Sequence, residues 1–190
     1  MLSAELGKPV HIHVDQQNHD RETASESVIR ILKDLDIRGS GEPLVWLVHS
    51  ISPSTYDEAR FERLLDGMRE TNVGIICCPS AALSMRQYRP LLTPTHNSIA
   101  RVLEMLAARI PVRIGSDNIC DITSPAGTLD LLDEMFVLTN AVRYYDLDIM
   151  SKIAAGSALD ESDCVKIKAH LDADAAEVRR ALDRFDAGMI

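Results

Sequence analysis

The sequence LEMLAARIPVRIGSDN, residues 103–118, decides the fold. Its first half has apolar residues at helical spacing, a short turn ends at Pro111, and Val112–Gly115 reads as a buried strand. A helix that runs directly into such a strand is the repeating unit of a parallel α/β fold. Functional residues in these folds lie beyond the carboxyl ends of the strands, so Asp117 is the first candidate functional residue.

Three other segments have the same character as this strand, since they are short, rich in β-branched residues and bounded by Gly or Pro. They are Val10–Val14, Leu44–Val48 and Val73–Cys77. The four predicted strands start at residues 10, 45, 73 and 112, so the steps are 35, 28 and 39 residues. A barrel of eight β/α units in ~250 residues advances by ~31 residues per unit, and this chain supplies half of those units.

Helical spacing fills the intervals between and after the strands, and it places a group of apolar residues on one face of each predicted helix. The four groups are Ala24, Val28, Ile31, Leu32 and Leu35; Ala59, Leu64, Leu65 and Met68; Ile99, Val102, Leu103 and Leu106; and Leu129, Leu132, Met135 and Phe136. A capping box at Thr55–Glu58 is expected to open the second helix. From about Asp146 the pattern is polar and helical, and it ends in an amphipathic segment at 173–185. We therefore predict a half-barrel domain over 1–145 and a helical C-terminal extension over 146–190.

The composition excludes several classes of function. The 190 residues carry 20 Lys and Arg against 29 Asp and Glu, a net charge of −9, and no basic block. Nucleic acids and anionic membranes need clustered basic residues, so neither is an expected partner. No apolar run is long enough to span a membrane, and the first residues do not resemble a signal peptide, which predicts a cytoplasmic protein.

Candidate ligands stand at the carboxyl ends of three predicted strands. His11 and His13 are two residues apart and so point to one face of the first strand, with His13 nearer its end. His49 ends the second strand and Asp117 follows the fourth. Imidazole and carboxylate are the ligands that Zn²⁺ and Fe²⁺ favour in hydrolytic sites, where a bound metal brings the pKa of a water to about 7.

Each of these residues also has an ordinary structural explanation. A histidine at a strand end is often a hydrogen-bonded structural residue, and Asp117 could cap the loop that follows it. Cys77 and Cys78 read as free thiols in the core. Three potential ligands at the same end of three strands are, however, a combination that independent structural roles would seldom produce.

From Gly7 to Met135 the sequence resembles the amidohydrolase superfamily, and within it the cytosine-deaminase-like branch. That family has a metal-dependent (β/α)8 barrel. Residues 7–15, 47–50 and 76–80 are similar to its strands 5, 6 and 7, and residues 103–118 are similar to helix 7 running into strand 8. The resemblance implies that His13 is the strand-5 metal ligand, that His49 polarises the substrate or binds a second metal, and that Asp117 is a metal ligand and proton shuttle. A rival placement takes His11-Ile-His13 as the His-x-His of strand 1, but it leaves His49 and Asp117 on strands that carry no such residues in the family.

Two departures from the family pattern bear on activity. The strand-5 motif of cytosine deaminases continues to a Glu that acts as general acid and base, whereas Gln16 stands at that position here. An amide does not exchange a proton near neutral pH, so deamination would need Asp15 or Asp20 as a substitute. Strands 1 to 4 and their His-x-His are also missing.

Half a barrel limits what the chain does alone. His13 and Asp117 are two ligands where a catalytic zinc usually has three, and His49, or His11 about 6–7 Å deeper on the strand, could be a further one. We therefore expect weak binding of Zn or Fe, or none, by the isolated chain. Four parallel strands leave two open edges, so we expect a homo-oligomer or a complex with a separate N-terminal half.

Two functions follow from these observations. The first is a metal-dependent hydrolase or deaminase that acts on C–N bonds of cyclic amides, amidines or aminated heterocycles, with a small molecule as substrate. The second is a truncated, inactive amidohydrolase-like half-barrel that serves as a subunit or a structural remnant.

Overall fold

The structure is a computed structural model that describes residues 2–84, 98–122 and 124–188. Its sheet has four parallel strands in the order β1-β2-β3-β4, which is also their order along the chain. Their bounds are β1 Val10–Val14, β2 Val45–His49, β3 Val73–Cys77 and β4 Val112–Ile114. Doubly wound sheets reverse the strand order at a switch point, whereas consecutive barrel units do not. The order is therefore that of a barrel segment.

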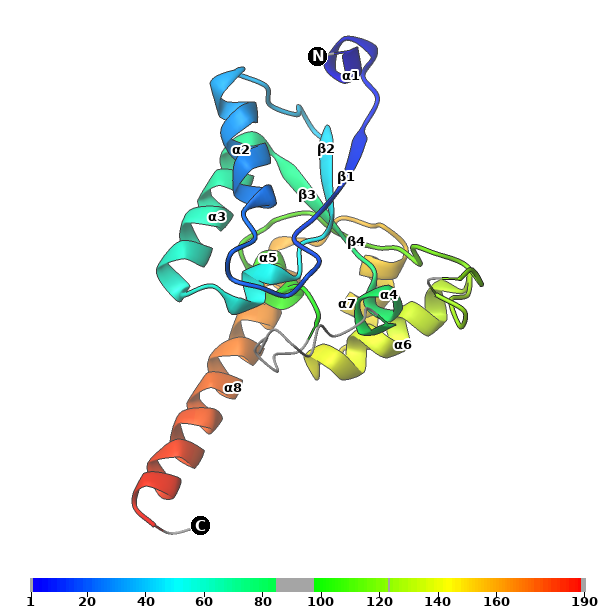
Figure 1. Ribbon diagram of the computed structural model, residues 1–190. Helices are drawn as coiled ribbons and strands as arrows, with labels where there is room; N and C mark the ends of the chain where they lie inside the picture. The colour runs from blue at the N-terminus through cyan, green and yellow to red at the C-terminus, as the bar shows by residue number, and fades with distance from the viewer. Residues whose placement is uncertain (1, 85–97, 123, 189–190) are drawn as a thin grey trace.

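The helices lie around this sheet as Figure 1 shows, with α2 and α3 together on one side of it and α4, α6 and α7 grouped near β4. Helix α2 packs against α3, α5 against α8, and α6 against both α4 and α7. Their bounds are α1 Leu2–Leu6, α2 Ala24–Asp34, α3 Glu58–Thr71, α4 Pro79–Ser84, α5 Val102–Ala107, α6 Leu131–Val142, α7 Leu147–Ala154 and α8 Glu161–Asp186, with a 3-10 turn at Ser52–Thr55. The expected fold, four parallel β/α units of a barrel followed by a helical C-terminal segment, is confirmed.

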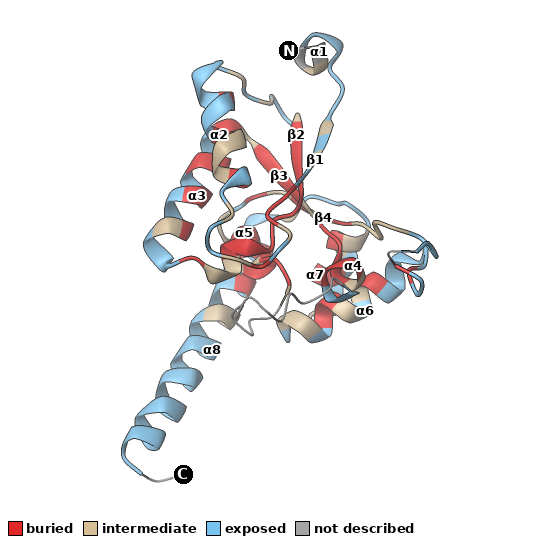
Figure 2. Cartoon of the chain, in the orientation of Figure 1, coloured by how far each residue is buried: buried red, intermediate tan, exposed pale blue. Residues whose placement is uncertain are grey.

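The two faces of the sheet carry different clusters. Leu47 and Ile75 point to the main core beneath the helices and are fully buried, while their neighbours Val48 and Ile76 belong to a small second cluster on the other face. Figure 2 shows β2 and β3 as the most buried elements. On that second face Gly74 is required, because a Cβ there would lie 2.6 Å from the ring of Trp46, which is itself buried.

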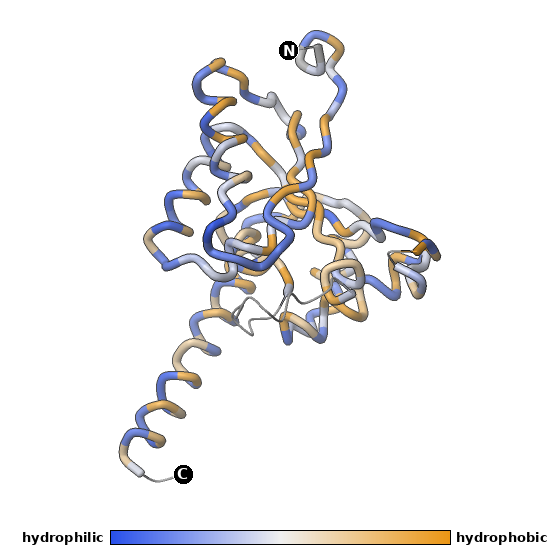
Figure 3. The backbone as a smooth tube through the Cα atoms, viewed as in Figure 1, coloured by the Kyte–Doolittle hydropathy of each residue, from blue (hydrophilic) through white to orange (hydrophobic). Residues whose placement is uncertain are grey.

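The apolar faces of two helices differ from expectation. Ile31 and Leu35 of the α2 segment and Leu132 and Phe136 of α6 are exposed, where the helical spacing predicts burial. The buried residues of α6 are instead Glu134, Leu138 and Thr139. In the hydropathy view of Figure 3, apolar residues also appear along the outer helices. The helices α2 and α6 follow β1 and β4, the two edge strands of the sheet.

The start of α3 differs from the one predicted from the sequence. Thr55 belongs to the 3-10 turn, and the N-cap of α3 is Asp57, whose carboxylate accepts the N–H of Arg60. The predicted capping box at Thr55–Glu58 is therefore wrong, because Tyr56 and Asp57 separate the end of the turn from the first residue of the helix.

Residues 146–190 contribute to the same core as the β/α units. Ile149, Met150 and Ile153 of α7 and Ile167 of α8 are fully buried within it. The division into two domains at residue 145 stays a prediction. Within the described part of the chain, no helix has the length and apolar character needed to cross a membrane.

Candidate metal centre

Three candidate residues stand at the carboxyl edge of the sheet. His13 is the fourth residue of β1 and His49 the last of β2, while Asp117 follows β4 after a three-residue step. His49 and Asp117 have positive φ values of 74° and 58°, a backbone conformation that non-glycine residues seldom adopt. Gly115 makes the step after β4 possible, because a Cβ there would lie 2.9 Å from Ile76.

The side chains of these three residues converge. His13 Nδ1 lies 3.1 Å from His49 Nε2, and His49 Nε2 lies 3.5 Å from Asp117 Oδ2. All three ligand atoms are within 4.8 Å of one another. His13 is exposed, whereas the side chain of His49 is 1% exposed and that of Asp117 is 17% exposed. The cluster is thus buried on one side and open on the side of β1.

Burial keeps His49 neutral. Desolvation lowers the pKa of His49, the neighbouring Asp117 carboxylate opposes this shift, and His13 adds to it. A neutral imidazole is the form that binds metals. The other ring nitrogen, His49 Nδ1, is buried and has no hydrogen-bond partner among the described residues.

The donor set fits a divalent metal. In a tetrahedral zinc site, atoms bound at about 2.0–2.1 Å lie about 3.3 Å from each other. The separations of 3.1 and 3.5 Å around His49 Nε2 are close to this value. Two imidazoles and one carboxylate are also a usual ligand set for zinc and for iron. One metal ion could bind all three atoms if the His13 and Asp117 side chains move closer together, because the three ligand atoms lie within 4.8 Å of one another, whereas two atoms bound at about 2.1 Å are at most about 4.2 Å apart.

Other sequence-predicted residues are placed elsewhere. His11 is exposed on β1 beside Trp46 and is not part of the cluster formed by the three converging side chains. Asp15 is buried, and its two oxygens accept the N–H groups of Ala24 and Ser25 at 2.8 and 2.9 Å. Asp15 therefore fixes the start of α2, so its carboxylate is already engaged.

Asp20 and Gln16, in the loop between β1 and α2, are two further polar residues that the sequence analysis named. Asp20 is exposed and paired with His19. Gln16 is half-buried directly after Asp15.

Sequence reasoning missed a network that holds the loop between β1 and α2. The hydroxyl of Tyr56 donates to the carbonyl of Glu22 at 2.5 Å, and Arg60 donates to the same carbonyl at 3.0 Å. The guanidinium of Arg60 also lies 3.4 Å from the centre of the Tyr56 ring and pairs with Glu26 at 2.7 Å. Burial is the main reason that the pKa of Tyr56 is raised. No local motif marks these residues, because the partners are more than 30 positions apart in the chain.

The cysteines below the site are inert thiols. Burial raises the pKa of Cys77 to about 12, and it also raises the pKa of Cys78. Cys164 is buried as well, and Cys120 is exposed. The interpretation of Cys77 and Cys78 as buried free thiols is confirmed.

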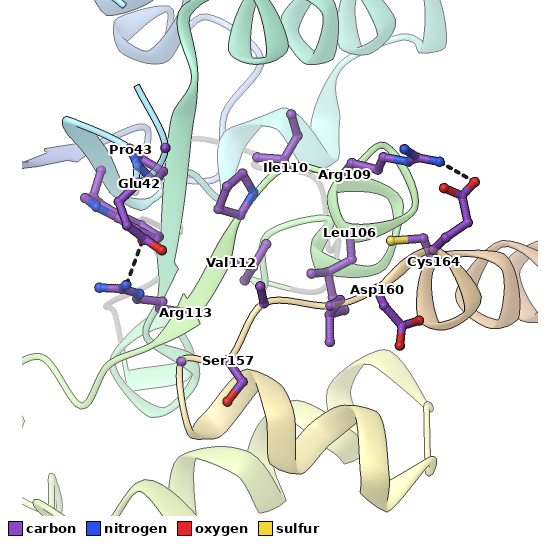
Figure 4. Close-up of a pocket in the computed structure, with 17 residues that line it drawn as sticks. Glu42, Pro43, Leu106, Arg109, Ile110, Val112, Arg113, Ser157, Asp160 and Cys164 are labelled. Carbon is purple, nitrogen blue, oxygen red and sulfur yellow. Dashed lines mark hydrogen bonds and ion pairs between the residues drawn. The ribbon is translucent and has the colours of Figure 1, made fainter. Parts of the chain in front are cut away.

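A separate cavity lies at the opposite edge of the sheet, near the amino ends of the strands (Figure 4). Its volume is about 300 Å³, and its lining includes Trp46, Leu106 and Val112. The two arginines that flank it are already paired, Arg113 with Glu42 at 3.0 Å and Arg109 with Glu161. Because both of its arginines are already engaged in ion pairs, this cavity is a poorer candidate for chemistry than the histidine cluster.

Comparison by sequence finds partial relatives. A pterin deaminase of Rhizobium rhizogenes is 25% identical over 146 residues, which are 77% of this chain and 32% of the relative. An uncharacterized protein of Haemophilus influenzae is 31% identical over 101 residues, which are 53% of this chain and 35% of that protein. No protein-family model matches the chain.

Solved structures share the fold. A 5-methylcytosine deaminase from Klebsiella pneumoniae, liganded with 5-fluorocytosine, superposes with a TM-score of 0.69 at 20% identity, over 80% of this chain and 37% of its own. An N-isopropylammelide isopropylaminohydrolase from Burkholderia multivorans superposes with a TM-score of 0.58 at 16% identity, over 88% of this chain and 38% of its own. The chain thus spans about a third of the length of these relatives. The fold that the resemblance implied is confirmed: the chain has the fold of a little more than a third of each of these two enzymes.

Proposed function

We propose that this chain contributes half of the active site of a metal-dependent hydrolase that cleaves C–N bonds of small heterocyclic substrates. The observation that carries the proposal is the convergence of His13, His49 and Asp117 at the carboxyl edge of the sheet. Relatives that share the fold or part of the sequence are named as deaminases of 5-methylcytosine and pterin and as an aminohydrolase of isopropylammelide. Cyclic amides, amidines and aminated heterocycles are therefore the proposed substrate class.

Each residue has a definite role in this proposal. His13 Nδ1, His49 Nε2 and Asp117 Oδ2 would hold the metal, Zn or Fe. When bound, such a metal lowers the pKa of water and polarises the bond to be cleaved. The carboxylate of Asp117 is partly open to solvent and can accept the proton that the attacking water releases. Neutral His49 lies between the two other groups and fixes their separation.

The barrel is completed by further β/α units, either from a second copy or from a separate polypeptide. β1 and β4 are the edge strands of the sheet, and parallel sheets are normally covered on both faces. The exposed large apolar residues of the neighbouring helices are Ile31 of α2 and Leu131, Leu132 and Phe136 of α6. Helices α3 and α5, which lie between them, have no exposed large apolar residue among those that the structure describes. Exposed apolar side chains thus lie on the helices that follow the two edge strands, and further ones lie on α4, at Leu83, and on α8.

A specific observation favours the second candidate, an inactive half-barrel. Gln16 stands where the resemblance implies a general acid and base, and Asp15 cannot replace it because both of its oxygens cap α2. Under this alternative the chain keeps the metal ligands and the fold but serves as a subunit without turnover.

Metal analysis tests the ligand set. The purified chain is equilibrated with Zn²⁺ or Fe²⁺ and dialysed, and the metal content is measured by mass spectrometry. We expect at most one ion per chain, held weakly as the sequence analysis predicts, and a loss of that ion in His13→Ala and Asp117→Ala. His11→Ala is the matched control, because His11 lies on the same strand as His13 but outside the cluster. If the His11→Ala variant loses the metal, His11 is the further ligand that the sequence suggested. Undiminished metal in His13→Ala and Asp117→Ala would contradict the proposal.

Ammonia release separates the two candidate functions. The metal-loaded chain is incubated with cytosine, 5-methylcytosine and pterin, alone and with a polypeptide that supplies the missing β/α units. Turnover that depends on Asp117 supports the hydrolase. Stoichiometric metal without turnover in either setting supports the inactive subunit.

A further inference from the structure

We propose that the outer half of α8 pairs in antiparallel orientation with α8 of a second copy of this chain. This contact is separate from the metal centre and from the open sheet edges. In Figure 1, α8 extends away from the sheet and from the helices around it, and in Figure 2 its outer half is exposed. The proposal therefore stands or fails independently of the proposed chemistry.

The base of α8 is firmly anchored. Asp160 and Asp163 form a capping box at its start, and the carboxylate of Asp163 accepts from Lys152 of α7 at 2.9 Å. Ile167 is fully buried in the core. Glu161 pairs with Arg109 next to the cavity of Figure 4. The direction in which α8 leaves the body is thus fixed by contacts in its first two turns.

The outer part of α8 has no such contacts. All residues of 172–186 are exposed, and 15 residues of helix are about 22 Å long. Isolated helices of about this length are marginally stable in water, since most of the stability of a helix in a protein comes from packing. Packing against another surface would therefore stabilise the exposed part of α8.

The exposed segment carries an apolar stripe suited to another helix. The stripe consists of Ala175, Val178, Leu182 and Phe185, at steps of three, four and three residues, and it continues from Leu171, which is half-buried and packs against the core of its own chain. This is the seven-residue repeat of a helix that packs against another helix. Val178, Leu182 and Phe185 are 52%, 58% and 68% exposed. These side chains lose contact with water when a second helix covers them.

Charges beside the stripe fit a second copy. When two α8 helices run antiparallel with Ala175 opposite Val178 of the partner copy, Asp172, which already pairs with Lys168 of its own helix at 3.1 Å, also lies beside Arg179 of the partner copy. By symmetry the Asp172 and Arg179 contact occurs twice. Antiparallel alignment also opposes the two helix dipoles, and it places the two bodies at opposite ends of the pair. A parallel pair would instead place Arg179 beside Asp174.

Sedimentation equilibrium of the full chain tests the contact. We expect a dimer at micromolar concentration that Val178→Asp converts to a monomer. Ala176→Asp is the matched control, because Ala176 lies on the opposite face of the helix and carries the same new charge. Circular dichroism of both variants checks that α8 stays helical. A monomeric wild-type chain, or a dimer that Val178→Asp leaves intact, overturns the proposal, and the second result would point to a different surface such as the sheet edges.

A charge exchange tests the orientation. Asp172→Arg and Arg179→Asp should each weaken the dimer about tenfold, because each removes two ion pairs and creates two like-charge contacts. Because Lys168 pairs with Asp172 in the same helix, all of these variants are made in a Lys168→Ala background, in which the double variant Asp172→Arg with Arg179→Asp should restore the dimer by exchanging the charges within each intermolecular pair. Failure of this rescue, or rescue by Asp174→Arg with Arg179→Asp, refutes the antiparallel pairing.

Discussion

Replacing Asp15 by asparagine separates a structural role from a catalytic one. The two carboxylate oxygens accept the N–H groups of Ala24 and Ser25 at 2.8 and 2.9 Å, and the bond to Ser25 is buried. Asparagine tolerates the positive φ of 49° at this position, so the backbone strain changes little. The amide keeps one acceptor but turns a donor toward the second N–H group. Hydrogen bonds to a charged group contribute about 1.5–3 kcal/mol each, so we expect the free energy of unfolding to fall by about 2 kcal/mol.

Urea denaturation at pH 7 measures this change. Asp20→Asn is the control, because Asp20 is exposed and its pairing with His19 should contribute less than about 0.5 kcal/mol. Metal content should be the same in Asp15→Asn as in the wild-type chain. The reasoning is refuted if Asp15→Asn unfolds at the wild-type urea concentration, or if it loses metal while its stability is unchanged.

Three further predictions concern stability and activity. The hydrogen bond from Lys152 lowers the pKa of Asp163, so the Asp163 carboxylate stabilises the fold above its ordinary pKa of 3.8 and loses that contribution as the pH falls below it. The difference in urea stability between the wild type and Asp163→Asn should therefore narrow between pH 5 and pH 2.5. A difference that stays constant over this range would argue against the Lys152–Asp163 pair. Gly74→Ala should cost about 1–3 kcal/mol in thermal or urea unfolding because the new Cβ meets the Trp46 ring, and a wild-type midpoint would contradict that packing. Gln16→Glu should raise the rate of ammonia release by the metal-loaded protein with its completed barrel. Equal rates for the variant and the wild type would show that a Glu at position 16 does not act as the general acid and base that the resemblance implies.

The strands and the convergence of the site were predictable because they depend on local composition and on one rule of topology. Apolar β-branched runs bounded by Gly or Pro gave the strands within one residue of their ends. Parallel strands place their carboxyl ends at one edge, so His13, His49 and Asp117 were expected to meet there, and their ligand atoms do lie together. Their service as metal ligands stays a prediction.

The remaining features depend on partners that local patterns do not reveal. The apolar positions Leu132 and Phe136 are typical of a buried helix face, but they are exposed because no described part of this chain covers them. The sequence offered Asp15 only as a possible substitute for the missing Glu, and its capping role could not be predicted because the N–H groups that it caps are nine and ten residues away. No local pattern predicts that the guanidinium of Arg60 donates to backbone carbonyls of the loop between β1 and α2.

Crystallography of the zinc-soaked full chain, with anomalous data collected at the zinc edge, tests the central claim most directly. We predict one strong anomalous peak at about 2.0–2.2 Å from His13 Nδ1, His49 Nε2 and Asp117 Oδ2. A peak bound by other residues, or no peak at the carboxyl edge of the sheet, would contradict the assignment of these three side chains as one metal centre.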